Sequence, residues 1–188
     1  MKILGIDPGT GRLGWAVLET QSLKVKSHVY RTSASSVESQ AGKNYNNTPK
    51  LISCGLIETP ANTKLDKRLK IIFKKLKSVI DKYKPQELAI EELFFVKNVK
   101  TAISVSHARG VAMLAASVGG LEIYEYKPNV IKLAITGYGH AGKDQIVKML
   151  KLHLKGCSIK QDDTADAIAV ALCHMQSRKS KIKNHAST

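Results

Sequence analysis

The stretch KILGIDPGTGRLGWAVLET, residues 2–20, carries the clearest fold signal in the chain. Residues 2–7 form a short apolar run that ends in Asp7, and Pro8-Gly9-Thr10-Gly11 then supplies typical turn residues. Residues 13–20 are again rich in apolar side chains. This order predicts a β-hairpin with Asp7 at the end of its first strand.

Beyond the hairpin, the spacing of apolar residues predicts an alternation of strands and helices. The expected strands cover residues 51–59, 87–91 and 121–126, and the expected helices cover residues 63–83, 99–118, 128–136, 142–154 and 163–175. Asn62 or Thr63 should cap the first of these helices, and the alanine-rich helix 99–118 should pack closely on both sides. The pattern predicts one mixed α/β domain over residues 1–178 without internal repeats.

Two segments depart from this pattern. Residues 22–50 are rich in Ser, Thr, Asn and Gln, which predicts a long loop between the second and third strands, either functional or disordered. Residues 179–188 belong to a basic polar tail that starts near Arg178 and should be frayed.

Composition narrows the function classes. The 188 residues include 30 Lys and Arg against 15 Asp and Glu, a formal charge of +15, which favours a phosphate-backbone partner or else reflects a lysine-rich proteome. Aromatic residues make up only 5%, which argues against recognition of single strands by stacking. We find no apolar run near the roughly 20 residues of a membrane span and no signal-peptide pattern, so we expect a cytoplasmic protein. The three widely spaced cysteines, Cys54, Cys157 and Cys173, should be buried thiols.

Four acids occupy positions where an acid is costly. Asp7 and Glu91 each follow an apolar strand, while Asp163 and Asp166 begin an apolar helix three residues apart and so share a face. Taken singly, each has an ordinary explanation: an Asx turn for Asp7, a helix-dipole contact for the helix pair, or solvation for Glu91. Brought together, four carboxylates would repel one another unless divalent cations neutralised them. The set therefore suggests a Mg²⁺ site suited to phosphodiester hydrolysis.

Several blocks of sequence follow one another along the chain. They start with ILGIDPG at residues 3–9 and GWAV at residues 14–17, and continue with AIEELFFVKN at residues 89–98 and ARGV at residues 108–111. They end with YKP at residues 126–128, TGYG at residues 136–139, Lys143, and DDTADAIA at residues 162–169. In their order and spacing, these blocks together resemble the RuvC family of Holliday-junction resolvases over nearly the whole chain. Relative to this family, residues 22–50 look like a flexible insertion, which would either touch DNA or have no role.

The resemblance implies an RNase H-like fold, with a five-stranded mixed sheet flanked by helices on both faces, in a homodimer that acts on a four-way DNA junction. It implies that Asp7, Glu91 rather than Glu92, Asp163 and Asp166 hold two Mg²⁺ ions, which Mn²⁺ can replace. Water activated there would leave 5′-phosphate and 3′-hydroxyl ends, and Lys143 would stabilise charge on the phosphate. A RuvA–RuvB branch-migration complex is the implied protein partner.

The same resemblance implies DNA contacts at Phe94, Lys97, Lys132 and Lys143. Phe94 would act as a wedge at the junction centre, although core packing after a buried strand is the alternative for this side chain. Arg109 is expected to pair with a carboxylate or a helix end rather than with phosphate.

Other function classes remain open on the sequence. The segment from Gly137 to Lys143 fits the P-loop spacing, but Asp144 stands where a P-loop needs Ser or Thr. A sugar-kinase or actin-like ATPase has a similar Asp-Gly turn and needs about twice this length. A YqgF-like nuclease that acts on ribosomal RNA precursor and a non-catalytic junction-binding module are the nearer alternatives.

Overall fold

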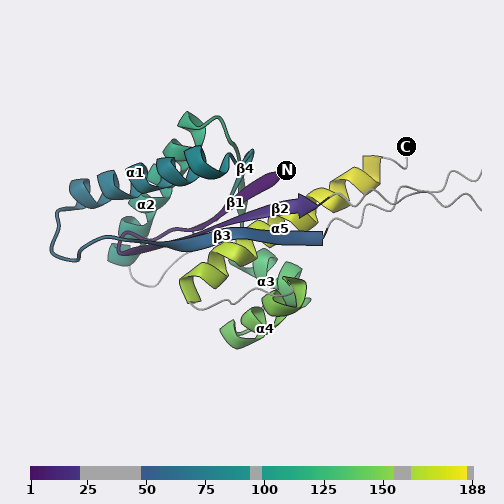
Figure 1. The fold of residues 1–188 in the computed structure, drawn as a ribbon. Helices are drawn as coiled ribbons and strands as arrows, with labels where there is room; N and C mark the ends of the chain where they lie inside the picture. The colour runs from purple at the N-terminus through teal and green to yellow at the C-terminus, as the bar shows by residue number, and fades with distance from the viewer. Residues whose placement is uncertain (22–47, 94–98, 155–161, 186–188) are drawn as a thin grey trace, which may run out of the picture.

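A mixed β-sheet forms the centre of the molecule (Figure 1). The computed structural model describes residues 1–21, 48–93, 99–154 and 162–185. Within these residues the sheet has five strands in the order β3-β2-β1-β4-β5. They are β1 (Lys2–Asp7), β2 (Arg12–Gln21), β3 (Thr48–Glu58), β4 (Glu87–Glu91) and β5 (Glu122–Tyr126). β1 pairs antiparallel with β2 and parallel with β4, which confirms the predicted hairpin.

Helices cover both faces of the sheet. α1 (Leu65–Tyr83) and α2 (Val99–Val118) lie together on one face. α5 (Asp162–His185) crosses the other face, with α3 (Pro128–Thr136) and α4 (Lys143–His153) packed outside it (Figure 1). None of the helices in the described ranges is both long enough and apolar enough to span a bilayer.

The alternation of β1 builds both halves of the core. Ile3 points to the core that α5 closes, whereas Leu4 and Ile6 point to the core that α1 and α2 close. All three side chains are buried, because the strand has neighbours on both edges and helices on both faces. Asp7, the next residue on the Ile3 face, therefore lies on the side of α5.

Several element boundaries differ from those expected from sequence. β3 starts at Thr48, inside the segment 22–50 that was expected to be a loop, and it includes Pro49; β3 is an edge strand, where a missing backbone donor is tolerated. Residues 22–47 lie outside the described part. α1 is capped by Lys64, with no side-chain cap bond, rather than by Asn62 or Thr63.

Two helices also differ in extent or environment. α2 has the expected bounds, but only its alanine face is buried, and Ile103, Leu114 and Val118 are exposed. The expectation of packing on both sides is met only in part: α2 contacts α1 and β5, but its outer face is exposed. α5 continues to His185, well past Arg178, because no glycine or proline interrupts it.

The P-loop alternative fails on topology. The segment from Gly137 to Lys143 joins α3 to α4, so it follows a helix, whereas a P-loop follows a strand. Gly137 ends α3 in the left-handed conformation, with φ of 77°, and this is the reason for a glycine there.

Candidate active site

Asp7 and Glu91 end two adjacent parallel strands. The register pairs Ile3 with Glu87 and Gly5 with Ala89, and one further step of two residues brings Asp7 beside Glu91. Both acids share the sheet face that α5 covers, because Ile3 and Ala89 on that face belong to the α5 core. The two acids also line one hollow of about 270 Å³. The structure thus brings these two strand ends together, while the roles of the two acids stay predictions.

Gly5 brings α5 unusually close to β1. A Cβ atom at this position would lie 2.7 Å from Ala171 Cβ and 2.9 Å from Ala171 N, with Ala167 O nearer still. Only a residue without a side chain permits this contact. The helix backbone is therefore held against the strand two residues before Asp7.

The direction of α5 places its acids at the correct end of the sheet. His174 on α5 bonds to Glu87 at the start of β4, with Nε2 and Oε2 2.7 Å apart. From His174 back to Asp166 is about 12 Å of helix, and from Glu87 forward to Glu91 is about 13 Å of strand. α5 thus runs antiparallel to β4, and Asp166 arrives near Glu91.

The electrostatics of Glu91 show that the acids influence one another. Burial and, secondly, the negative charge of Asp166 raise the pKa of Glu91 to about 6, although Lys132 on α3 partly offsets this. Lys143, the first residue of α4, places its Nζ 3.8 Å from Asp166 Oδ2. Of the two lysines singled out from sequence, Lys143 thus lies beside Asp166, and Lys132 is near enough to lower the pKa of Glu91.

The donor set suits a hard divalent cation. Among the described side chains, no group of three His, Cys, Asp or Glu residues is close enough together to hold an ion as it stands. Asp163 lies in the first turn of α5, but its side chain is outside the described part. Carboxylate oxygens are preferred ligands of Mg²⁺, and an ion between Glu91 and Asp166 would relieve the repulsion that raises the pKa of Glu91. The residues therefore fit such an ion.

Arg109 on α2 contacts the backbone of the site. It donates from Nε to the backbone oxygen of Glu91, 3.3 Å away, and its guanidinium pairs with Glu125 on β5. This confirms the expectation that Arg109 pairs with a carboxylate. Phe94 and Lys97, the other expected DNA contacts, lie outside the described residues, and their roles stay predictions.

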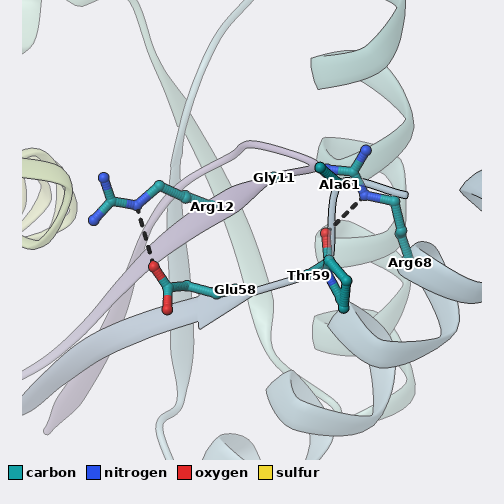
Figure 2. A pocket seen from close by; sticks show the side chains of 7 residues that line it. Gly11, Arg12, Glu58, Thr59, Ala61 and Arg68 are labelled. Atoms are coloured by element: carbon teal, nitrogen blue, oxygen red, sulfur yellow. Dashed lines mark hydrogen bonds and ion pairs between the residues drawn. The ribbon is translucent and has the colours of Figure 1, made fainter. Parts of the chain in front are cut away.

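Sequence reasoning missed a cluster around the turn between β1 and β2. Arg68 on α1 donates from Nε to Thr59 Oγ1 (2.7 Å), and the Thr59 hydroxyl donates to the backbone oxygen of Thr10 (2.5 Å). Arg12 pairs with Glu58 at 3.5 Å on the other side of Gly11 (Figure 2). No motif linked these positions, because they come from three separate elements.

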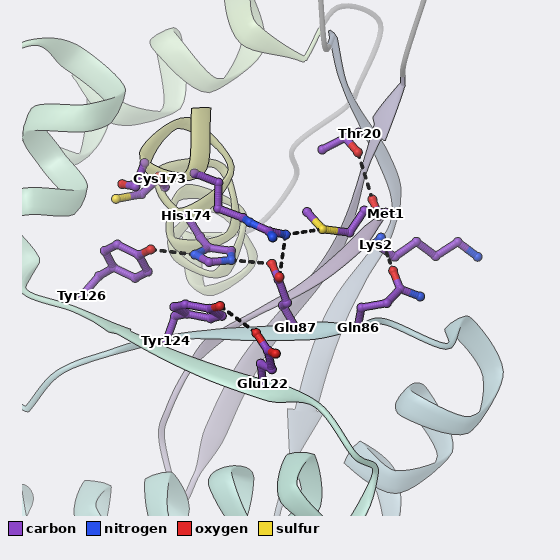
Figure 3. Close-up of polar contacts among 12 residues, drawn as sticks. Met1, Lys2, Thr20, Gln86, Glu87, Glu122, Tyr124, Tyr126, Cys173 and His174 are labelled. Atoms are coloured by element: carbon purple, nitrogen blue, oxygen red, sulfur yellow. Dashed lines mark hydrogen bonds and ion pairs between the residues drawn. The ribbon is translucent and has the colours of Figure 1, made fainter. Parts of the chain in front are cut away.

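A second missed cluster joins α5 to the start of β4 (Figure 3). The ring of His174 is fully buried and contacts Glu87 through Nε2 and the hydroxyl of Tyr126 through Nδ1, at 2.6 Å. Arg178 Nη1 lies 2.5 Å from the other Glu87 oxygen. Two signals in the sequence could have identified this cluster: an acid within the apolar strand ELAIE and a histidine within an apolar helix.

The sheet order, together with acids from β1, β4 and α5 at one end, defines the RNase H-like fold. The family model described as crossover junction endodeoxyribonuclease RuvC matches residues 39–174. A protein of that name from Brachyspira hyodysenteriae is 44% identical over 174 residues, which is 93% of both chains. The chain belongs to the RuvC family, and the family implies a nuclease that depends on divalent metal ions.

Other relatives agree. The crossover junction endodeoxyribonuclease RuvC of Halothermothrix orenii is 43% identical over 93% of this chain and 92% of its own. Among solved structures, Thermus thermophilus RuvC in complex with a Holliday junction substrate has 27% identity and a TM-score of 0.77, covering 96% of each chain. The yeast mitochondrial Holliday junction resolvase, at 11% identity and a TM-score of 0.64, supports the fold alone. The ATPase and YqgF-like alternatives find no support among these matches.

Proposed function

We propose that the chain resolves four-way DNA junctions by hydrolysing two opposing strands symmetrically. The observation that carries this proposal is the meeting of Asp7 and Glu91 in one hollow, with Asp166 close enough to raise the pKa of Glu91. The relatives' names and the junction in the Thermus thermophilus complex supply the substrate class. The basic composition suits a partner made of phosphate backbone.

The proposed chemistry assigns a role to each site residue. Asp7, Glu91, Asp163 and Asp166 hold two Mg²⁺ ions, for which Mn²⁺ can substitute, and such ions act as Lewis acids on phosphate oxygens. The Lys143 ammonium, which lies beside Asp166, stabilises charge on the phosphate. Lys132, whose charge acts on Glu91, attracts the same strand. The products carry 5′-phosphate and 3′-hydroxyl ends.

The test uses a synthetic four-way junction with Mg²⁺ or Mn²⁺. The protein should cut opposing strands at symmetric positions, and Asp7→Asn should abolish cutting while junction binding persists, because it removes one carboxylate ligand and keeps the side-chain shape. Asp81→Asn is the matched control, since Asp81 is exposed on α1 and pairs with Lys77 at the surface. Equal cutting of plain duplex, or full activity of Asp7→Asn, would contradict the proposal.

We also propose that the working form is a homodimer joined through α2. Ile103, Leu114 and Val118 are 54%, 55% and 61% exposed, and their positions on the helix fall within a narrow stripe. Large apolar side chains that line one helix face are typical of a protein interface. A second copy that covers this stripe would supply the second active site that paired cutting requires.

Leu114→Glu should break the dimer, because it puts a charge at the centre of the stripe. We expect sedimentation equilibrium to show a monomer, and we expect nicks on the two strands to become uncoupled. Lys82→Glu, at the far end of α1, is the control for a new negative charge. A dimer that survives Leu114→Glu would place the interface elsewhere.

The family resemblance extends this proposal to a RuvA–RuvB branch-migration complex as protein partner and to the cytoplasm as place of action. Co-sedimentation of the three proteins on a junction tests the partnership. Failure of this protein to join RuvA and RuvB on the junction would remove that part of the proposal.

A further inference from the structure

A groove leads away from the catalytic acids around the turn between β1 and β2. The hollow at Asp7 shares Val105 with a second hollow of about 440 Å³, lined by the turn residues and by hydroxyl side chains of α2. That hollow shares Gly11 with a third, of about 480 Å³, at the start of α1 (Figure 2). Because each hollow shares a lining residue with the next, we call the three together the track from the acids to Arg68.

The polar character of the track changes along its length. Its acidic end holds Asp7 and Glu91, and its middle offers the hydroxyls of Thr10 and Ser104, whose oxygens lie 2.6 Å apart. Its far end is cationic, since Arg68 and Arg12 line the third hollow together with Glu58. Because Glu58 pairs with Arg12, Arg68 supplies the net positive charge there.

Arg68 is held in a fixed position. Its Nε donates to the buried Thr59 hydroxyl, which is itself fixed by its bond to the Thr10 backbone oxygen. This anchoring uses Nε, and the Arg68 side chain lines the third hollow. No carboxylate in the described part of the chain forms an ion pair with Arg68. A pre-positioned guanidinium of this kind suits a phosphate.

Gly11 leaves the space that Arg68 occupies. A Cβ atom at position 11 would lie 3.3 Å from Arg68 Nη2, which is tighter than an ordinary contact. The turn that follows Asp7 therefore ends at Gly11, whose lack of a side chain makes room for Arg68.

The distance between the two ends fits a DNA strand. From Asp7 to Gly11 the chain spans at most about 14 Å, and the Arg68 guanidinium lies against Gly11. A strand of duplex advances about 3.4 Å per nucleotide, so this length together with the contact to Arg68 corresponds to no more than about five nucleotides. We propose that Arg68 binds a backbone phosphate of the strand being cut, within about five nucleotides of the scissile phosphate. This inference rests on the proposed junction-cleaving function.

The first measurement is the salt dependence of junction binding. Arg68→Gln should lower the slope of log K against log salt by about 0.9, the value for one lost phosphate contact, and weaken binding about tenfold at low salt. Lys74→Gln removes the same charge from an exposed position about 9 Å along α1 on a different face, and should leave the slope unchanged. An unchanged slope in Arg68→Gln would overturn the proposal.

The second measurement locates the phosphate. Single neutral methylphosphonates are placed at successive positions on the cut strand, and binding is measured for each. Wild-type binding should weaken at a particular position near the cut, and Arg68→Gln should no longer respond there. If the two proteins respond identically at every position, Arg68 has only a structural role.

A further pair of variants keeps the test open if Arg68→Gln does not fold. Gly11→Asp would place a carboxylate against the Arg68 guanidinium and neutralise it in place, and should lose the same methylphosphonate response. Gly11→Asn has the same size without the charge and should retain that response. Wild-type protein that binds but never cuts junctions would refute the proposed function, whereas normal cutting with unchanged variants would refute only the Arg68 site.

Discussion

Replacing Gly5 with alanine should move α5 and so separate its acids from those on the strands. The new Cβ would lie 2.7 Å from Ala171 Cβ, whereas carbon atoms pack best at about 3.5–4.0 Å. Relief of this clash requires a shift of roughly 1 Å, which falls on the helix because β1 is held between β2 and β4.

The shift should affect stability and catalysis to different degrees. Overpacking in a tight core costs about 1–3 kcal/mol, which lowers the free energy of unfolding without preventing folding. A displacement of about 1 Å at a catalytic group costs roughly 100-fold in rate, and the shift would carry Asp166 away from Glu91 in the proposed site. Junction affinity should change less than the cleavage rate, because Arg68 on α1 lies on the opposite face of the sheet from α5.

Urea unfolding and single-turnover cleavage at saturating Mg²⁺ would measure the two effects. Gly139→Ala serves as the control for the substitution itself, because a Cβ there would lie 3.5 Å from its nearest neighbour, an ordinary contact. The reasoning would be refuted if Gly5→Ala unfolded like wild type and cut at a similar rate. It would also be refuted if stability fell and the cleavage rate did not.

Two further predictions concern buried acids. The pKa of Glu91 is about 6 in the folded protein against 4.5 for the free side chain, so ionisation of Glu91 destabilises the fold as pH rises through this window. In the presence of a chelator, Glu91→Gln should therefore be up to about 2 kcal/mol more stable than wild type in urea at pH 8. At pH 4 the variant should be no more stable than wild type. Equal stability of this variant and wild type at pH 8 would contradict the assigned burial of charge. His174→Leu should cost about 3–5 kcal/mol, because the buried Glu87 loses a partner, and adding Glu87→Gln should restore part of that loss. Strictly additive losses in the double variant would show that the pair is not coupled.

Local sequence patterns predicted most helices and strands, but they could not predict which strands are neighbours; the pairing register of the strands shows this. The run before Asp7 and the run before Glu91 identified two strand ends from composition alone. Only the parallel pairing of Gly5 with Ala89 shows that these ends are neighbours on one face. The resemblance to a family anticipated this meeting before any pairing was known.

Features that arise only when one element packs against another were predicted less well. The alanines of α2 fit a helix buried on one side or on two, so its exposed stripe was not predictable. Thr59, Arg68 and Gly11 looked unremarkable in sequence, because their relation comes from the packing of α1 against the end of the sheet. His174 and Glu87 are 87 residues apart, and only the fold joins them.

Two positions on α5 are held at opposite ends of β4. Between Asp166 at the acids and His174 at Glu87 there are about two turns of helix, matched to the length of β4. One residue added or removed in that interval would rotate one end by about 100° relative to the other. Either the buried pair or the acids would then face the wrong way, so this segment can vary in side chains far more readily than in length.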